Sequence, residues 1–563
     1  MPFFRRFMLP LCGALAFTLV AGDVPKAAAP VAKATSKAKA APAASLPAPV
    51  KVASVEGITE YQLANGLRVL LFPDASKPTI TTNITYLVGS RNENYGETGM
   101  AHLLEHMVFK GTPRHPNVPQ LLNELGGDFN GTTSMDRTNY YISFPATEAN
   151  LGKALDLEAD RMVNSNFTAK TLWGEDGKSG EMTVVRNEFE NGENSPFRVA
   201  IQRLMAVAFD WHNYGKSTIG ARTDIEKVNV DHLRAFYARY YQPDNAILVV
   251  AGQFDEAKTI TRINETFGVL PRPARIIEPT YTQDPIQDGE RSVTIRRVGG
   301  TPLLVVGYHV AAAFSPTRSQ LDLASSMLAS GPGSRLYKAL VETKLAAQVF
   351  STSDGATEPG LMMFGVMLPA DGDVDKVKAV LLKELEELKA NPFTAVELDR
   401  AQTKMRKQVD QTFSDTKNLA ISLSESMAAG DWRHLFLDRD WTFDAKLDQV
   451  QAVAESALKA SNRTLAQYIP MEKPDRTVIP ATPDISALAK AYKGKESVVQ
   501  GEAFDASPEN VEARAQRFTA PNGMKGALLA KKTKGAMAAV QITLRFGREA
   551  DLMNRKAVPS TTW

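Results

Sequence analysis

Cysteine is almost absent from this chain. Its 563 residues include a single cysteine, Cys12, which lies in the N-terminal leader. Once the leader is cleaved, the mature chain would have none, which excludes disulfides and thiolate ligands for zinc. An exported protein without disulfides must depend on a large apolar core, and a chain of this length can build one.

Long apolar runs are also scarce. One run extends from Phe7 to Val20, and its 14 residues are too few to span a bilayer comfortably. Arg5 and Arg6 precede the run and the small residues Ala21 and Gly22 follow it, so residues 1–22 are predicted to be a signal peptide. An uncleaved anchor is the less favoured alternative. We expect an exported protein, periplasmic, with no stable membrane span after cleavage.

The chain after its N-terminal segments, residues 52–563, carries little net charge. Residues 23–51 form an Ala/Pro/Lys tract without periodicity, which predicts a disordered tether. The leader and the tract carry +6 of a total net charge of +2, which leaves −4 for residues 52–563. A mildly acidic body gives no support for nucleic-acid binding, and the basic tract could at most contact an anionic surface.

Histidine is rare too, yet two of the seven histidines are four residues apart. His102 and His106 belong to the string His-Leu-Leu-Glu-His, the inverted form of a zinc-protease signature. At this spacing both imidazoles share one helix face and can reach one Zn²⁺, while Glu105 can reach a water on the metal. Thr98 is predicted to cap the helix and Gly111 to end it.

A catalytic zinc site needs a third protein ligand. Glu181 and Glu188 are seven residues apart, so they would project from the same face of a helix. Acids stacked in this way repel one another unless they are solvated or drawn to a cation. Glu190 and Glu193 are weaker candidates, interpreted as solvated charges.

Residues 99–112, followed by the Glu-x-x-Val-Val-x-x-Glu of residues 181–188, resemble the pitrilysin/insulinase family of zinc peptidases. The resemblance implies that Glu188 is the third ligand of one Zn²⁺ per chain and that Glu181 is a supporting acid. The interval of 82 positions from His106 to Glu188 is slightly longer than the family has. The turn-rich residues 173–180 are the expected site of the surplus.

Residues 125–141 resemble the family's edge strand beside the zinc. An exposed edge offers unpaired backbone N–H and C=O groups, which can take up a peptide as an added strand. The resemblance implies that Asn130, Gly131, Thr132 and Thr133 bind substrate. Taken alone, the stretch also fits an ordinary hairpin strand.

The expected fold class is α+β, with two homologous α/β-sandwich domains of the pitrilysin-like fold and the start of a third. We expect the catalytic zinc-peptidase domain over 52–275, a metal-free homologous domain over 276–495, a linker over 496–519 and a truncated third domain over 520–563. Apolar alternation predicts strands that include residues 61–71 and 79–88, and Asn65–Gly66 predicts a tight turn.

The third domain is inferred from an internal repeat. Residues 522–547 repeat residues 65–89 with one residue of slippage, which indicates duplicated domains. About forty residues supply roughly two strands, too few to close a core. We therefore expect a homologous second half or subunit as a partner of this chain.

The resulting hypothesis is a zinc-dependent endopeptidase of the cell envelope that cleaves peptides or unfolded polypeptides. His102, His106 and Glu188 would hold the metal, Glu105 would act as general base and Glu181 would orient the ligands. The alternative is a partner-dependent or non-catalytic subunit of a two-part complex. A zinc hydrolase with another kind of substrate is a more remote reading.

Overall fold

The computed structural model describes residues 46–353, 355–495 and 497–545. The predicted signal peptide, most of the tether and the last 18 residues of the predicted third domain lie outside this part of the chain. One compact unit ends at Asp475 and a second begins at Arg476. Among the described residues, no helix is long and apolar enough to cross a membrane.

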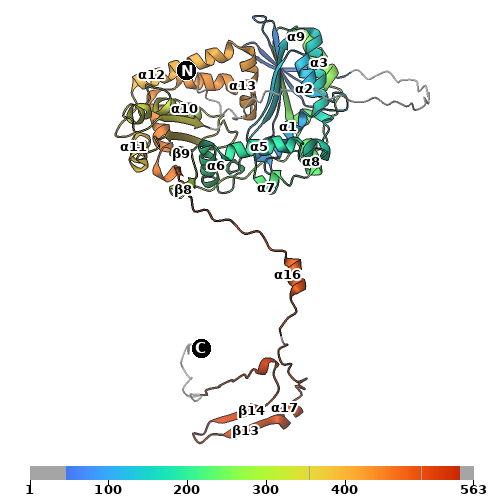
Figure 1. The fold of residues 1–563 in the computed structure, drawn as a ribbon, viewed down its shortest axis with the longest axis vertical. Coiled ribbons are helices and arrows are strands. Elements are labelled where there is room, and N and C mark those ends of the chain that lie inside the picture. Colours follow the sequence, from blue (N-terminus) through green and yellow to red (C-terminus); the bar gives the residue numbers. More distant parts are fainter. Residues whose placement is uncertain (1–45, 354, 496, 546–563) are drawn as a thin grey trace, which may run out of the picture. The chain divides into compact units, whose positions relative to one another are not determined.

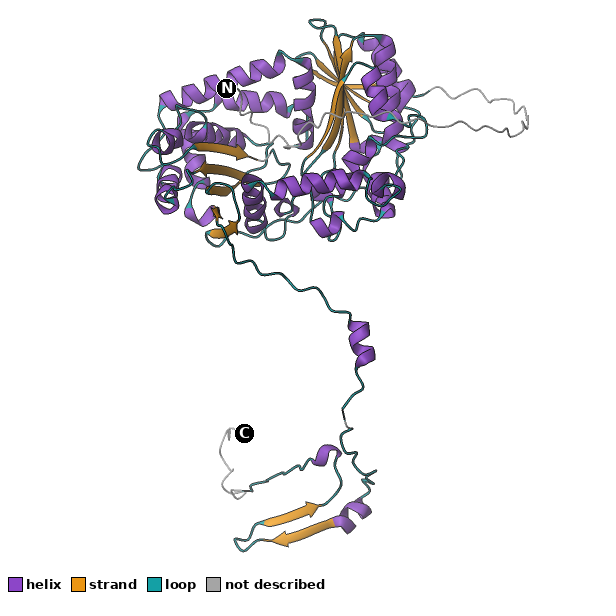
Figure 2. Ribbon diagram, viewed as in Figure 1, coloured by secondary structure: helices purple, strands orange, loops and turns teal. Residues whose placement is uncertain are grey.

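The first unit contains two mixed β-sheets, and the first has seven strands (Figure 2). Its central strand, β7, pairs in parallel with β3 on one side and antiparallel with β4 on the other. The predicted turn at Asn65–Gly66 is confirmed and separates the second strand from the third, so the expectation of one strand over residues 61–71 is wrong. In spatial order the strands are β1 (Val50–Val55), β2 (Ile58–Gln62), β3 (Arg68–Pro73), β7 (Ala246–Gly252), β4 (Thr79–Tyr86), β6 (Thr138–Pro145) and β5 (Asp128–Thr133).

The second sheet repeats the plan of the first. Its parallel pair β8–β12 corresponds to β3–β7, and three antiparallel strands follow in the same order. This shared order confirms that the first unit is built from two copies of one α+β domain. In spatial order the strands are β8 (Arg291–Arg297), β12 (Arg463–Pro470), β9 (Leu303–Val310), β11 (Gly360–Met367) and β10 (Gln348–Ser353).

Helices cover both faces of each sheet, which is why the central strands are apolar at every position rather than at alternate ones. On one face, each sheet packs against helices of its own domain. The helices of the first half are α1 (Met100–Val108), α2 (Val118–Glu124), α3 (Glu148–Val163), α4 (Ala169–Trp173), α5 (Glu181–Glu193), α6 (Pro196–Ala208), α7 (Arg222–Ile225), α8 (Val230–Tyr240) and α9 (Glu256–Phe267). Those of the second half are α10 (Pro316–Ala329), α11 (Val374–Glu386), α12 (Ala395–Phe413), α13 (Thr416–Ala428), α14 (His434–Asp444) and α15 (Leu447–Ala457).

The other face of each sheet is covered by a helix from the opposite half of the chain (Figure 1). Helix α6 buries Leu204 against Val305 and Leu361 of the second sheet. Helix α13 buries Leu423 against Val249 of the first sheet. The two halves therefore share two cores and form one structural unit.

The second unit is small and consists of α16 (Ile485–Ala491), α17 (Pro508–Arg514) and the antiparallel strands β13 (Ala515–Thr519) and β14 (Lys525–Leu529). Short helical turns complete the chain: η1 (Ser90–Asn92), η2 (Asn213–Gly215), η3 (Pro243–Asn245), η4 (Tyr337–Val341), η5 (Ala460–Asn462) and η6 (Lys534–Ala536).

Candidate functional site

Helix α1 carries the two histidines, and its N-terminus is not capped as the sequence predicted. The cap residue is Gly99, in the left-handed region with φ +90°, and Thr98 instead donates its hydroxyl to Asp224 at 2.7 Å. The first free N–H groups of the helix, those of Gly99 and Ala101, donate to the buried Glu93 carboxylate at 2.8 Å each. A side chain six residues upstream has taken the place of the local cap.

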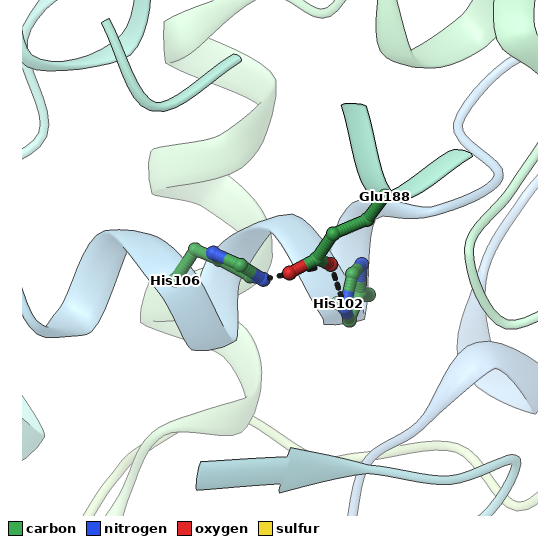
Figure 3. A group of neighbouring side chains, drawn as sticks. All are labelled: His102, His106 and Glu188. Carbon is green, nitrogen blue, oxygen red and sulfur yellow. Dashed lines mark ion pairs between the residues drawn. The ribbon is translucent and has the colours of Figure 1, made fainter. Parts of the chain in front are cut away.

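The apolar face of α1 packs into the first core through Leu103, Leu104 and Met107, which fixes the direction of the opposite face. That face presents His102 and His106, whose ring centroids are 4.8 Å apart. Both imidazoles point toward Glu188 of α5 (Figure 3).

The three side chains form a donor set that fits zinc. The Nε2 atoms of His102 and His106 each lie 3.5 Å from Oε2 of Glu188. Tetrahedral zinc with bonds of about 2.0 Å places its ligand atoms about 3.3 Å apart. Within the described ranges, these three residues make up the one group of metal-binding side chains close enough to share an ion. Glu190 and Glu193 lie elsewhere, near Arg222 and Arg297 respectively.

Glu181 stands behind the second histidine. Its Oε1 is hydrogen-bonded to Nδ1 of His106 at 2.8 Å, and its other oxygen pairs with Lys110. Burial would raise the pKa of Glu181, but the contacts with His106 and Lys110 lower it overall, so the carboxylate stays charged. A carboxylate on the far ring nitrogen fixes the tautomer and orientation of a ligating histidine.

The two histidines differ in protonation when no metal is bound. Burial and the neighbouring His106 lower the pKa of His102 to about 4. Burial alone would lower the pKa of His106 as well, but hydrogen bonds to Glu181 and Glu188 raise it to about 10. At neutral pH the metal-free site therefore holds one proton, on His106, between two carboxylates.

Zinc binding at pH 7 is therefore expected to release about one proton, because a ligating imidazole must be neutral. The pKa of His106 is raised, so the proton competes with the metal at all pH values below about 10. Zinc affinity should then rise about tenfold per pH unit between pH 6 and 8. Titration calorimetry in buffers of different ionisation enthalpy measures this proton; equal heats in all buffers would place it elsewhere.

Glu105 lies on the same helix, beside the metal-binding group, and is held by the neighbouring strand. Thr133 of β5 donates its hydroxyl to Oε2 of Glu105 at 2.6 Å. A Cβ on Gly131 would lie 3.0 Å from Cγ of Glu105, so the strand can approach the carboxylate this closely because position 131 is glycine. Burial raises the pKa of Glu105, partly offset by His106 and Thr133. A raised pKa suits a group that must accept a proton and later return it.

Strand β5 is the edge strand of the first sheet, and among the described residues it pairs with β6 alone. The hairpin closes with the N–H of Ser134 donating to Arg137 O at 2.8 Å. Hydrogen-bonded pairs alternate in an antiparallel ladder, so the backbone groups of Gly131 and Thr133 point away from β6 toward the free edge.

The four residues predicted to bind substrate thus lie on two different faces of β5. Gly131 and Thr133 face α1 and expose backbone groups at the edge beside the metal-binding group. Asn130 and Thr132 face the other side, where Thr132 donates its hydroxyl to Asn139 at 2.5 Å. The sequence analysis did not identify Lys110 or Glu93 as part of the site. Lys110 lies four residues after His106 on the same helix face, and this spacing could have revealed it. No local pattern points to Glu93.

Comparisons with known proteins place the chain among zinc peptidases of one family. Residues 68–222 match the family described as "Insulinase (Peptidase family M16)", and residues 227–405 match "Peptidase M16 inactive domain". The chain is 30% identical over 413 residues to the zinc protease PqqE of Helicobacter pylori, covering 71% of this chain and 90% of that protein.

Solved structures show the same likeness. A crystal structure of a protease from Helicobacter pylori has a TM-score of 0.68 and 29% identity, covering 73% of this chain and 99% of that one. The first half of the periplasmic protease PqqL from Escherichia coli shares the fold at a TM-score of 0.61 and 19% identity, covering 75% of this chain and 94% of that one.

Proposed function

This chain belongs to the M16 family of zinc peptidases, the insulinase and pitrilysin family, and we propose that it is itself an active zinc-dependent endopeptidase. The observation that carries the proposal is the convergence of His102, His106 and Glu188 with Glu105 intact beside them. A domain that only held a metal would have no need of a buried acid hydrogen-bonded by the edge strand.

The chemistry divides between the metal and the chain. Zinc, when bound, lowers the pKa of a water toward ~7 and polarises a carbonyl. Glu105 takes the proton of the attacking water and delivers it to the amine nitrogen of the departing peptide. Thr133 holds Glu105 in place, and the N–H and C=O groups of Gly131 and Thr133 pair with the substrate backbone.

Backbone pairing sets the substrate class. An added strand must be extended and free of its own secondary structure, and recognition through main-chain groups is tolerant of sequence. Peptides and unfolded polypeptides meet both conditions. Their place of cleavage is proposed to be the cell envelope, on the evidence of the N-terminal leader in the sequence.

The second unit favours a homologous partner. Strands β13 and β14 pair in the register of β2 and β3, with Thr519 opposite Lys525 as Gln62 is opposite Arg68. The turns match as well. The N–H of Leu67 donates to Asn65 at 3.2 Å, and the N–H of Met524 donates to Asn522 at the same distance.

Among its described residues, the second unit has no strand that corresponds to the central strand β7 of the first sheet. In the first sheet β7 lies between β3 and β4, in parallel with the former and antiparallel to the latter. In the second unit the residues that correspond to β4, 537–545, form no strand, and β14 pairs with β13 alone. A homologous half that supplies a strand like β7 would join these two segments into one sheet.

Hydrolysis of a quenched fluorescent peptide tests both parts of the proposal. We expect cleavage that a chelator abolishes and that zinc restores, and a further rise in rate when a homologous second half is added as a separate polypeptide. Size-exclusion chromatography of the mixture reports the association. Metal-dependent cleavage without any response to the second half would refute the partner alone, whereas no cleavage in either case would refute the peptidase.

A further inference from the structure

We propose that Glu358 of the metal-free domain, acting through Arg91, is a positioning residue that holds the zinc helix and the substrate edge in one arrangement. Glu358 lies in the loop between β10 and β11, far from α1 in the sequence. The kinetic part of this proposal rests on the peptidase function proposed above; the structural part does not.

One contact between the two domains is a partly buried cluster of charges. Arg91 of η1 pairs through Nε with Asp136 at 2.8 Å and through Nη1 with Glu358. The second oxygen of Glu358 accepts a hydrogen bond from Nε2 of His212 at 2.6 Å. The Nδ1 of His212 already accepts the N–H of Tyr214 at 3.1 Å, so the ring proton belongs on Nε2 and the imidazole donates to Glu358.

Asp136 connects this cluster to the substrate edge. It lies in the turn between β5 and β6, two residues before Thr138 and three after Thr133. Its carboxylate accepts hydrogen bonds from Tyr214 at 2.8 and 3.0 Å and from the N–H of Thr357 of the metal-free domain at 3.0 Å. Both domains therefore hold the turn that leads out of β5.

The backbone of η1 adds a second link to the same turn. The N–H of Ser90 donates to Ser134 O at 3.2 Å, and the N–H of Arg91 donates to Met135 O at 2.9 Å. A displacement of Arg91 would therefore move the end of β5, where Thr133 holds Glu105.

The third link leads to the zinc helix. Glu93, two residues after Arg91, binds the first N–H groups of α1. The Asn213 side chain clamps the intervening backbone by donating to Arg91 O at 2.7 Å and to Glu93 O at 3.0 Å. One short turn thus joins the metal-free domain, the edge strand and the helix that carries His102 and His106, although neither Arg91 nor Glu358 touches these histidines.

The test compares Glu358→Gln with a matched control, Glu386→Gln. Glu386 is also a carboxylate of the metal-free domain with a mostly buried side chain, and the partners described for it, Arg463 at 2.7 Å and Tyr308 at 2.8 Å, both belong to that same domain. Both variants lose an ion pair of the same kind, so a merely structural role predicts equal effects.

We expect Glu358→Gln to speed amide exchange at Gly99 and Ala101 about tenfold in the metal-free protein, and to lower kcat per bound zinc about tenfold. Glu386→Gln should leave both unchanged while lowering the melting temperature to a similar extent. Adding Arg91→Lys to Glu358→Gln should cost little more than the worse single change, because the two residues act as one unit.

Equal exchange rates at Gly99 and Ala101 in the two variants would overturn the positioning role, whatever the activity. Faster exchange in Glu358→Gln with unchanged kcat would overturn its relevance to catalysis. If the wild-type chain cleaves no peptide, the exchange measurement still decides the structural part, so failure of the peptidase function is distinguishable from failure of this inference.

Discussion

Glu105→Gln is expected to retain stoichiometric zinc and to lower kcat/KM by about 10³-fold. Glutamine keeps the volume of the side chain and can still accept the hydrogen bond from Thr133, but it cannot take a proton from water. General acid–base groups contribute roughly 10²–10⁴-fold to rate, and here one residue serves in both directions. Peptide hydrolysis and metal analysis on the same preparation measure the two effects.

Glu190→Gln is the matched control for this change, since Glu190 is half exposed on α5 and lies near Arg222 rather than the metal-binding group. It should retain wild-type activity. A Glu105→Gln variant with undiminished hydrolysis would remove the general base from the mechanism and leave the site as a metal-binding site alone.

Glu188→Ala is expected to weaken zinc binding far more than Glu181→Ala does. Glu188 is one of three side chains that converge on a single point, whereas Glu181 binds the far nitrogen of His106. Loss of a supporting carboxylate typically costs about 10–100-fold in metal affinity, so the loss of a direct ligand should exceed about 100-fold. Competition against a chromophoric chelator gives both affinities.

The order of the two variants is the decisive outcome. If Glu181→Ala weakened zinc binding as much as Glu188→Ala, the assignment of ligand and supporting acid would be wrong. Retention of tight binding by Glu188→Ala would mean that another side chain completes the site.

The sequence predicted best what is encoded locally. The spacing of His102, Glu105 and His106 places them on one helix face in any α-helix, and the turn at Asn65–Gly66 follows from glycine's access to positive φ, which is +101° at Gly66. The seven-residue spacing of Glu181 and Glu188 made both of them candidates for the third ligand, but only the resemblance to a known family chose Glu188, because no local rule joins residues 82 positions apart in the chain.

The errors and omissions concern contacts between distant segments. Thr98 has the right chemistry for a cap, but Asp224 competes for its hydroxyl and Glu93 supplies the acceptor instead. The sequence also gave no sign that β7 inserts between β3 and β4, which follow each other along the chain. Periodicity identifies an amphipathic helix such as α6 but does not say which sheet its apolar face will cover.

The exchange of α6 and α13 between the halves bears on the history of the chain. Deleting the metal-free domain would expose Leu70, Ile247 and Val249 of the first sheet, which α13 shields from water. It would also leave the apolar face of α6 without the second sheet that this face covers. A patch of that kind promotes aggregation. The domain without a metal-binding group would thus be retained for a physical reason, because the solubility of the domain that carries the metal-binding group depends on it.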